Sequence, residues 1–454
     1  MIVFILVALL ATFLAWYLSG ARSLAYLLYF LAYVPFLTLD GEAGGLSELS
    51  ALGSSNGLFK LTIRAVASVG MLLLLVRRRE ATRAILAGRS LPVLCFVAWA
   101  VLGLPASQTP LISLFRLGEL LVFFLTGVTL YLEGARGRNP REVARWHCLA
   151  LLPLLIVALW SITNRPELAF HVNASGLGRL GHKMLNANVL GFGAVILCLW
   201  GTHEMREKGR GRRAWARERL LPLTVLGLAI AVMVLTRSRT ALVTLLAGQL
   251  VLWLPVDKGN PRRRLMFIAL AVLGMLGAMM QFEEVMAWVL RDGSTAELMS
   301  GTGRTGLWAA LLTEQVPSAP ITGAGYLMLS SEGAFSHAGT WWTNTHNTYL
   351  FALVSTGLPG LIGILMIAVL PMRATLRRYL SAAPEDRSAW TLILACQTVV
   401  VVSGVTGFGI CGFPNAVMLF HFALYTWSLA PSGIPRPMPR LRAVAVRPNL
   451  GGAR

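Results

Sequence analysis

Apolar segments long enough to cross a membrane recur along almost the whole chain, and this recurrence limits the fold more than any other feature. A transmembrane helix needs about 20 mainly apolar residues, because no water is present in the bilayer core to satisfy its backbone. Only 13% of the residues are charged, against about 25% in an ordinary soluble domain. We therefore expect an all-α polytopic integral membrane protein.

Thirteen candidate segments can be marked, and we expect about 12 of them to span the membrane. The first begins "MIVFILVALL" without a basic stretch or a small-residue cleavage site, so we expect a retained helix and not a signal peptide. The segments are 2–19, 23–39, 58–76, 91–105, 112–132, 146–163, 186–203, 221–236, 241–255, 266–281, 347–370, 389–407 and 413–430. Together they predict a single transmembrane domain over 1–430.

The net charge of +20 is concentrated in every second connection between these segments. This is the pattern by which Lys and Arg mark cytoplasmic loops, and it argues against nucleic-acid binding. It predicts a cytoplasmic C-terminus, with the Arg/Pro-rich tail 431–454 disordered. The basic connections are 77–89, 135–145, 206–219, 258–264 and 373–378.

The remaining connections are expected on the outer side, and one of them, 282–346, is far longer than an ordinary connection. Loops of that length are usually functional. The stretch "GRTGLWAALLTEQV" (303–316) has helical apolar spacing, so we expect short amphipathic helices in this loop. The other outer connections are 40–57, 106–111, 164–185, 237–240 and 408–412.

Ten basic residues fall on the outer side, where the topology rule does not explain them. A single Arg there can reach lipid headgroups, but acid partners are scarce, with four Asp in the chain. A converging set predicts an anion-binding cavity, and a lipid-linked phosphate or pyrophosphate fits the planar fork of Arg. The residues are Lys60, Arg64, Arg116, Arg165, Arg179, Lys183, Arg237, Arg239, Arg291 and Arg304.

His346 stands at the outer end of segment 347–370, after the polar run "TNT". The positive end of a helix dipole favours a neutral imidazole there, and a neutral His facing arginines can act as a general base. A role in capping the helix is the alternative. The sequence has no HExxH, no Asp-rich DxD motif and no Cys/His quartet, so neither a metal site nor a cofactor is predicted.

Several short motifs resemble those of the bacterial O-antigen ligase/polymerase superfamily, most strongly over 185–370. In the ligase pattern, His346 and Asn347 are followed by Gly357 and Gly360. The motifs are "NANVLG" (186–191), "TRSRTALV" (236–243), "GRTGLWAALL" (303–312), "ITGAGYLM" (321–328) and "HNTYLFALVSTGLPG" (346–360).

The resemblance implies a metal-independent inverting glycosyltransferase of lipopolysaccharide biosynthesis. Its donor would be O-antigen linked to undecaprenyl pyrophosphate and its acceptor the lipid A core oligosaccharide. The protein would lie among the lipids of the bacterial inner membrane, with 282–346 as a periplasmic loop and the active site facing the periplasm.

Carried over by motif, His346 would be the catalytic base and Arg239 and Arg304 would bind pyrophosphate, with Arg237 as a further ligand. Secondary candidates for the site are His337, Asn347, Arg116 and Lys183.

Other functions remain open. A polymerase of the same superfamily would extend a lipid-linked glycan, and a protein O-oligosaccharyltransferase would modify Ser or Thr. The fit of the His346 motif and the single dominant outer loop favour the ligase. A lipid-linked glycan transporter would need a basic cavity open to both sides. The ionisable residues inside the apolar segments lie near outer ends, and Arg116 with Glu119 has the spacing of an ion pair.

Overall fold

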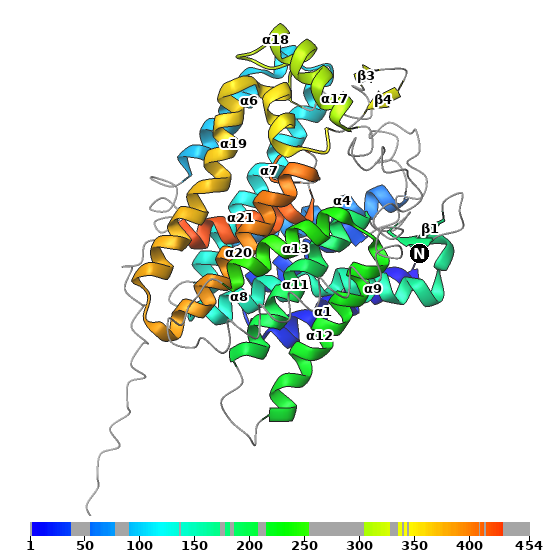
Figure 1. Cartoon of the computed structure of the whole chain (residues 1–454), viewed down its shortest axis with the longest axis vertical. Coiled ribbons are helices and arrows are strands. Elements are labelled where there is room, and N and C mark those ends of the chain that lie inside the picture. Colours follow the sequence, from blue (N-terminus) through cyan, green and yellow to red (C-terminus); the bar gives the residue numbers. More distant parts are fainter. Residues whose placement is uncertain are drawn as a thin grey trace, which may run out of the picture.

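The structure is a computed structural model, and nearly all of the chain that it describes is helical (Figure 1). The helical architecture that the sequence predicted is therefore confirmed for most of these residues, with two short β-hairpins that it did not predict. The predicted segment 266–281, the first part of the loop 282–346 and the tail 431–454 lie outside them. The described ranges are 2–37, 55–77, 90–135, 138–172, 178–181, 186–207, 215–253, 304–326, 335–337, 340–342, 345–407, 409–412 and 415–429.

The described residues of the first part of the chain form a series of helices. Its elements are α1 (Ile2–Ser19), α2 (Leu24–Leu31), η1 (Val34–Leu37), α4 (Ser55–Val76), α6 (Leu91–Leu102), η2 (Leu104–Ala106), α7 (Pro110–Leu130), η3 (Tyr131–Ala135), α8 (Pro140–Leu149), α9 (Leu152–Asn164) and α10 (Pro166–Ala169).

The second part adds two short antiparallel hairpins. Its elements are β1 (Phe170–Val172), β2 (Gly178–Leu180), α11 (Ala187–Glu207), α12 (Trp215–Thr236), α13 (Arg239–Leu252), α17 (Arg304–Ala310), η5 (Leu311–Gln315), α18 (Val316–Ser318), β3 (Phe335–His337), β4 (Thr340–Trp342), α19 (Thr348–Ser381), α20 (Pro384–Thr406) and α21 (Ala416–Leu429). The short helices expected within 303–316 are present as α17 and η5.

The predicted segment 146–163 lies within one candidate span, Pro140–Asn164, but a turn divides this span into α8, which ends at Leu149, and α9, which begins at Leu152. Pro153 lies in the first turn of α9, where its missing N–H costs nothing, but it could not continue α8. α8 also begins earlier than predicted. The Asn139 side chain caps it by accepting a hydrogen bond from the Arg141 amide at 2.8 Å.

Several described helices are suited to a bilayer. Exposed side chains such as Leu10, Leu73 and Leu250 cover their outer faces, as expected where lipid is the solvent. This supports a multi-pass membrane protein, while the number of spans stays a prediction. The 5 helices long and apolar enough to cross are Pro110–Glu133, Pro140–Asn164, Arg219–Thr236, Thr348–Ser381 and Pro384–Val405, with shorter apolar helices at Val3–Ser19, Leu24–Phe36, Thr62–Val76, Leu91–Leu102, Arg239–Leu252 and Ala416–Leu429.

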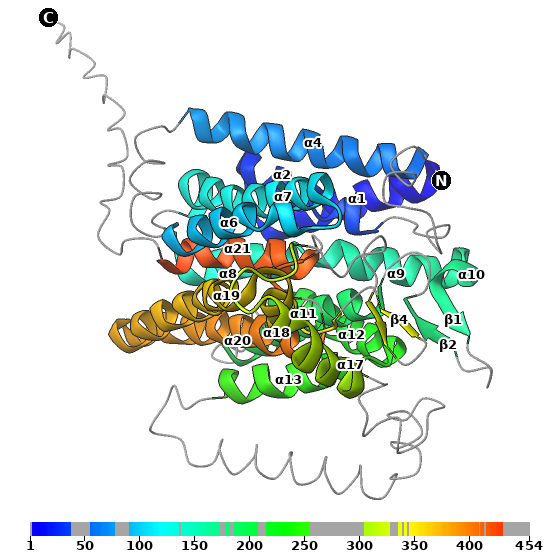
Figure 2. The ribbon, with the colours of Figure 1, turned by 90° about the horizontal axis from the view of Figure 1, so that it is seen from above.

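The bundle is built in layers around α11, whose side chains are mostly buried (Figure 2). α12, α13 and α20 pack against α11, while α21 packs against α7, and α7 against α4. α19 lies beside α20 and also contacts α6 and α21. This arrangement places the starts of α11, α13 and α19 and the end of α12 near one another.

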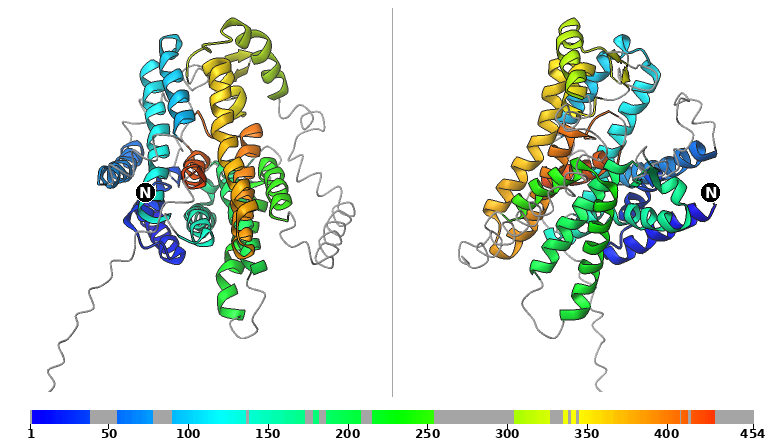
Figure 3. Two further views of the ribbon diagram at one scale, coloured as in Figure 1. Left: turned by 90° about the vertical axis from the view of Figure 1, so that its left-hand side faces the viewer. Right: turned by 45° about the vertical axis from the view of Figure 1, so that its right-hand side comes forward.

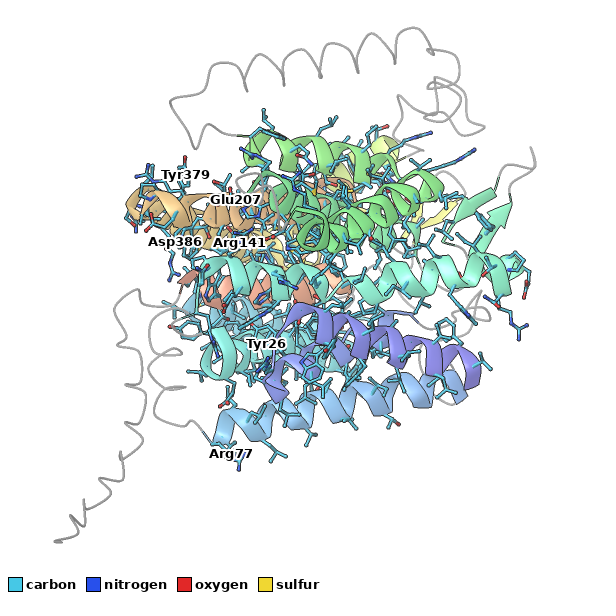
Figure 4. All side chains as sticks on the ribbon, turned by 90° about the horizontal axis from the view of Figure 1, so that it is seen from below. Tyr26, Arg77, Arg141, Glu207, Tyr379 and Asp386 are labelled. Carbon is cyan, nitrogen blue, oxygen red and sulfur yellow. The ribbon has the colours of Figure 1, made fainter. Side chains whose placement is uncertain are left out.

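Connections predicted to share one side of the membrane do share one end of the bundle. In Figure 4, Arg77, Arg141, Glu207, Tyr379 and Asp386 all lie toward the left-hand end. Each comes from or borders a connection predicted to be cytoplasmic. The residues that border these predicted cytoplasmic connections therefore lie toward the same end of the bundle.

Arginine–tryptophan contacts mark the same basic connections. The Arg206 guanidinium lies 4.0 Å from the centroid of the Trp253 ring, and that of Arg378 lies 5.0 Å from the centroid of Trp390. Tryptophan and cationic side chains gather where a helix leaves the hydrocarbon. These contacts are consistent with a membrane interface at this end.

Helix α19 is broken at Gly357, which has φ 68° and ψ −170°. A side chain at this position would collide with the Ile321 carbonyl, so the backbone conformation and the close approach both require glycine. Figure 3 shows α17 and α18 lying over the N-terminal end of α19. The break lies within the stretch "STGLPG" (355–360), two residues before Pro359.

The segment 319–326, which contains most of the motif "ITGAGYLM", is bonded to the break in α19. The Ala324 amide donates to the Val354 carbonyl at 2.9 Å, and the Leu358 amide donates to the Pro320 carbonyl at 2.9 Å. These bonds satisfy backbone groups that the break would leave without helical partners. They also tie the end of α18 to the first turns of α19.

Candidate active site

The turn between α12 and α13 carries two of the predicted anion-binding arginines. Ser238 caps α13, because its Oγ accepts a hydrogen bond from the Ala241 amide at 3.3 Å. Arg239 is therefore the first residue of α13, and Arg237 lies in the turn with φ 46°. The connection is shorter than the predicted 237–240: Arg237 lies in it, and Arg239 lies directly after it in the first turn of α13.

Arg179 reaches the same turn from the β1–β2 hairpin. The hairpin pairs His171 with Arg179. The Arg179 Nε donates to the Thr236 carbonyl at 2.8 Å, and its Nη2 donates to Asn188 Oδ1 at 3.4 Å. Burial, followed by the charges of Arg239 and Arg304, lowers the pKa of Arg179. Arg179 thus lies within electrostatic range of both predicted pyrophosphate ligands.

Arg304 is brought to the cluster by α17, which packs on the start of α19. Leu307 and Leu311 form a small buried core with Leu350, and the Trp308 indole donates to the Thr345 carbonyl at 2.8 Å. Burial and then the charge of Arg239 lower the pKa of Arg304. The packing of α17 therefore determines how far Arg304 lies from the loop before α19.

His346 lies in that loop, directly before α19. Asn347 is the helix cap, and its Oδ1 accepts from the Tyr349 and Leu350 amides, each at 3.0 Å. The capping role considered for His346 therefore belongs to Asn347. Burial and then the charge of Arg304 lower the pKa of His346 to about 4, so its ring is neutral at pH 7.

The cluster also holds unusual backbone. Within the described ranges, the non-glycine residues with left-handed φ are Arg237, at 46°, and His346, at 51°. Such conformations cost about 1–3 kcal/mol and persist where the surrounding structure enforces them, often at functional sites. Both residues belong to the site that the sequence predicted.

Arg179, Arg239, Arg304 and His346 form what we call the arginine cluster. Half-buried guanidinium groups that repel one another favour a multivalent anion, and Arg binds phosphate oxygens in pairs. A neutral imidazole beside such an anion can accept a proton. Within the described residues there is no group of three or more His, Cys, Asp or Glu arranged to hold a metal ion.

The sequence predicted that the ten basic residues of the outer side would converge on one anion site. Several of them instead lie away from the arginine cluster. Arg64 and Arg116 both pair with Glu119, Arg64 at 2.8 Å and Arg116 at 2.5 Å. The Arg116–Glu119 ion pair suggested by the sequence spacing is confirmed, with Arg64 as a third member. Arg165 is exposed and lies 3.8 Å from Glu167. These arginines have carboxylate partners, which the scarcity of Asp did not suggest.

The other candidates can be placed only in part. The backbone of His337 is in β3, opposite Thr340, but its side chain is outside the described residues, as is all of Lys183. Arg179 was missed as a site residue. Its one sequence signal was a basic charge on the outer side, which it shared with nine others.

Comparison with known proteins supports the resemblance that the motifs indicated. Residues 223–365 match a family described as "O-Antigen ligase". Over 143 residues the chain is 34% identical to the exopolysaccharide production protein ExoQ of Rhizobium meliloti (strain 1021), covering 29% of this chain and 31% of that protein. The match thus spans about a third of the length of this curated relative. The family match contains Arg239, Arg304 and His346, whereas Arg179 lies outside it.

Proposed function

We propose that the chain, which is similar to the O-antigen ligase family over residues 223–365, transfers O-antigen from undecaprenyl pyrophosphate to a sugar hydroxyl of lipid A core. The reaction would be a step of lipopolysaccharide biosynthesis at the periplasmic face of the bacterial inner membrane. The observation that carries the proposal is a neutral His346 within electrostatic range of Arg304, itself beside Arg239.

His346 is the general base. Its ring takes the proton of the acceptor hydroxyl as that oxygen attacks the anomeric carbon. A pyrophosphate bound near Arg304 would bring negative charge and raise the pKa of His346 from about 4 toward its ordinary range. The base is therefore strengthened when the donor arrives. General-base assistance of this kind is typically worth about 10²–10⁴ in rate.

The arginines hold the leaving group. The bond from the anomeric carbon to the pyrophosphate oxygen breaks as the bond to the acceptor oxygen forms on the opposite face, so the configuration inverts. Undecaprenyl pyrophosphate departs as an anion and keeps the bonding electrons. Arg239 and Arg304 bind it, with Arg179 and Arg237 beside them. The loss of one positioned charge typically costs about 10²–10³ in rate, and this route needs no metal ion.

A polymerase of the same superfamily is the second candidate. The relative from Rhizobium meliloti is named for exopolysaccharide production, which suits an enzyme that extends a lipid-linked glycan. The same base and arginines would serve, with a sugar hydroxyl of a second lipid-linked glycan as the acceptor. A transporter has less support, because the described cluster lies at one end of the bundle and transport needs access from both sides.

The test is transfer in vitro with purified protein, a lipid-pyrophosphate-linked glycan, lipid A core and EDTA. Wild type is compared with His346→Asn, since Asn tolerates the φ of 51° at this position but is not basic. The matched control is Arg165→Gln, which removes an exposed charge. Glycosylated core that is formed by wild type and the control, and lost in His346→Asn, supports the ligase.

Other products would give different answers. An elongated lipid-linked glycan without glycosylated core would identify the polymerase. Product that disappears when EDTA is added would contradict metal independence. If the lipid donor only changed leaflet in vesicles, the enzymatic function would be wrong.

A further inference from the structure

The motif "NANVLG" (186–191) opens α11 and has no role in the reaction described above. Its backbone is capped by Asn186, whose Oδ1 accepts a hydrogen bond from the Asn188 amide at 2.8 Å. One turn later, a side-chain carbon at Gly191 would lie 2.8 Å from the Ala241 Cβ. Glycine is therefore needed for α13 to approach α11. The motif brings the start of α13, which carries Arg239, against the start of α11.

Asn188, on α11, contacts both the β1–β2 hairpin and the turn before α13. Its Oδ1 accepts a hydrogen bond from Ser238 Oγ at 3.0 Å and another from Arg179 Nη2 at 3.4 Å. Ser238 is 1% exposed and caps the helix that begins at Arg239. One amide oxygen therefore orients both the hairpin arginine and the turn before Arg239.

We propose that Asn188 is a positioning residue, a neutral acceptor that holds Arg179 and the Ser238 turn without cancelling the positive charge offered to a pyrophosphate. This inference rests on the proposed function, because it concerns the same anion. It assigns to Asn188 a role in donor affinity and not in proton transfer.

The choice of acceptor supports this assignment, because the same bundle anchors other arginines with carboxylates. Arg141 is held by both oxygens of Glu204, at 3.0 and 3.1 Å. Within the described ranges, the hydrogen bonds of Arg179 go instead to a peptide carbonyl and to the Asn188 amide. A carboxylate at 188 could accept the same two bonds, but it would pair with Arg179 and compete with the bound anion.

Asn188→Asp separates geometry from charge. It keeps an oxygen for Ser238 and Arg179 and adds one negative charge. We expect affinity for farnesyl pyrophosphate, measured by calorimetry on protein in nanodiscs, to fall by about tenfold or more, because the new carboxylate would pair with Arg179 and repel the anion. In transfer assays the KM for the donor should rise with kcat changed little.

The added charge should also raise the pKa of His346 and move the acid limb of the kcat/KM profile to higher pH, which a merely structural role would not do. Asn164→Asp is the charge control, because Asn164 is an exposed residue at the end of α9. This variant should bind farnesyl pyrophosphate like wild type. Melting temperatures of all variants show whether each one folds.

Asn188→Ala tests the positioning itself. Loss of both accepted bonds should weaken binding in the wild-type background but much less in the Arg179→Gln background, because the two residues act together. If Asn188→Ala does not fold, Asn188→Asp, which keeps the acceptor, still decides. Wild-type affinity in a folded Asn188→Asp protein would overturn the inference. If Arg239→Gln also bound normally, the proposed anion site itself would be wrong.

Discussion

The kcat/KM for the donor should not fall when the pH is lowered from about 7.5 to about 5.5. The kcat/KM for the donor reports the pKa values of the free enzyme. Burial and Arg304 lower the pKa of His346 to about 4. The neutral, proton-accepting form of His346 is therefore present throughout the range from about pH 7.5 to about pH 5.5.

The protonated fraction gives the size of the effect. At pH 5.5 a histidine with the ordinary pKa near 6.5 would be about 90% protonated, and its kcat/KM would fall about tenfold. With a pKa of about 4, about 3% of His346 is protonated at that pH, and the loss is too small to measure. The acid limb of kcat should lie at higher pH than that of kcat/KM, because the bound pyrophosphate raises the pKa of His346.

The assay is the initial rate of transfer at low and at saturating donor across this range, with Arg304→Gln beside wild type. Removal of the Arg304 charge should move the acid limb of kcat/KM to higher pH. Arg165→Gln, an exposed arginine next to Glu167, should leave it in place. A wild-type midpoint near pH 6.5, or an Arg304→Gln profile identical to that of wild type, would refute the reasoning.

Three further substitutions test how the site is held. Gly357→Ala should lower the melting temperature, because alanine is strained by about 1–3 kcal/mol at this φ and its side chain would collide with the Ile321 carbonyl. Gly227→Ala, where the added carbon would meet open space on α12, should leave the melting temperature unchanged. Asn347→Ala removes a cap that accepts from two amides and should destabilise the protein by about 1 kcal/mol in denaturant melts, while Asn347→Asp should not. Trp308→Phe removes the indole hydrogen bond to the loop before α19 and should lower kcat more than donor binding; equal losses in both would contradict this.

Much of the fold could be predicted because apolar length and the placement of charge are local properties. Each predicted apolar segment that falls on described residues lies on helical structure. The boundaries were less certain. α19 continues to Ser381, past the predicted 370. Hydropathy marks only the apolar part of a helix, and the basic run "RATLRR" (373–378) that follows is also helical. The division at 149–152 was missed, because the hydropathy of Leu149–Leu152 gives no sign that the helix stops.

The site could be predicted only where a motif carried it. His346, Arg239 and Arg304 lie in distinct motifs, and the structure brings their charges within range of one another. Arg179 could not be assigned, because its position depends on a hairpin docking against the end of α12. The Arg116–Glu119 pair could be predicted from its spacing within α7, but the position of Arg64 could not, because the approach of α4 to α7 places it on the same carboxylate.

The central claim is that His346 accepts the proton and the arginines hold the leaving group. The most direct test measures donor binding and single-turnover transfer in wild type, His346→Asn and Arg239→Gln. We predict that His346→Asn binds the donor like wild type but transfers it at least about 10²-fold more slowly, and that Arg239→Gln loses donor affinity. Near-normal transfer by a folded His346→Asn protein would contradict the account.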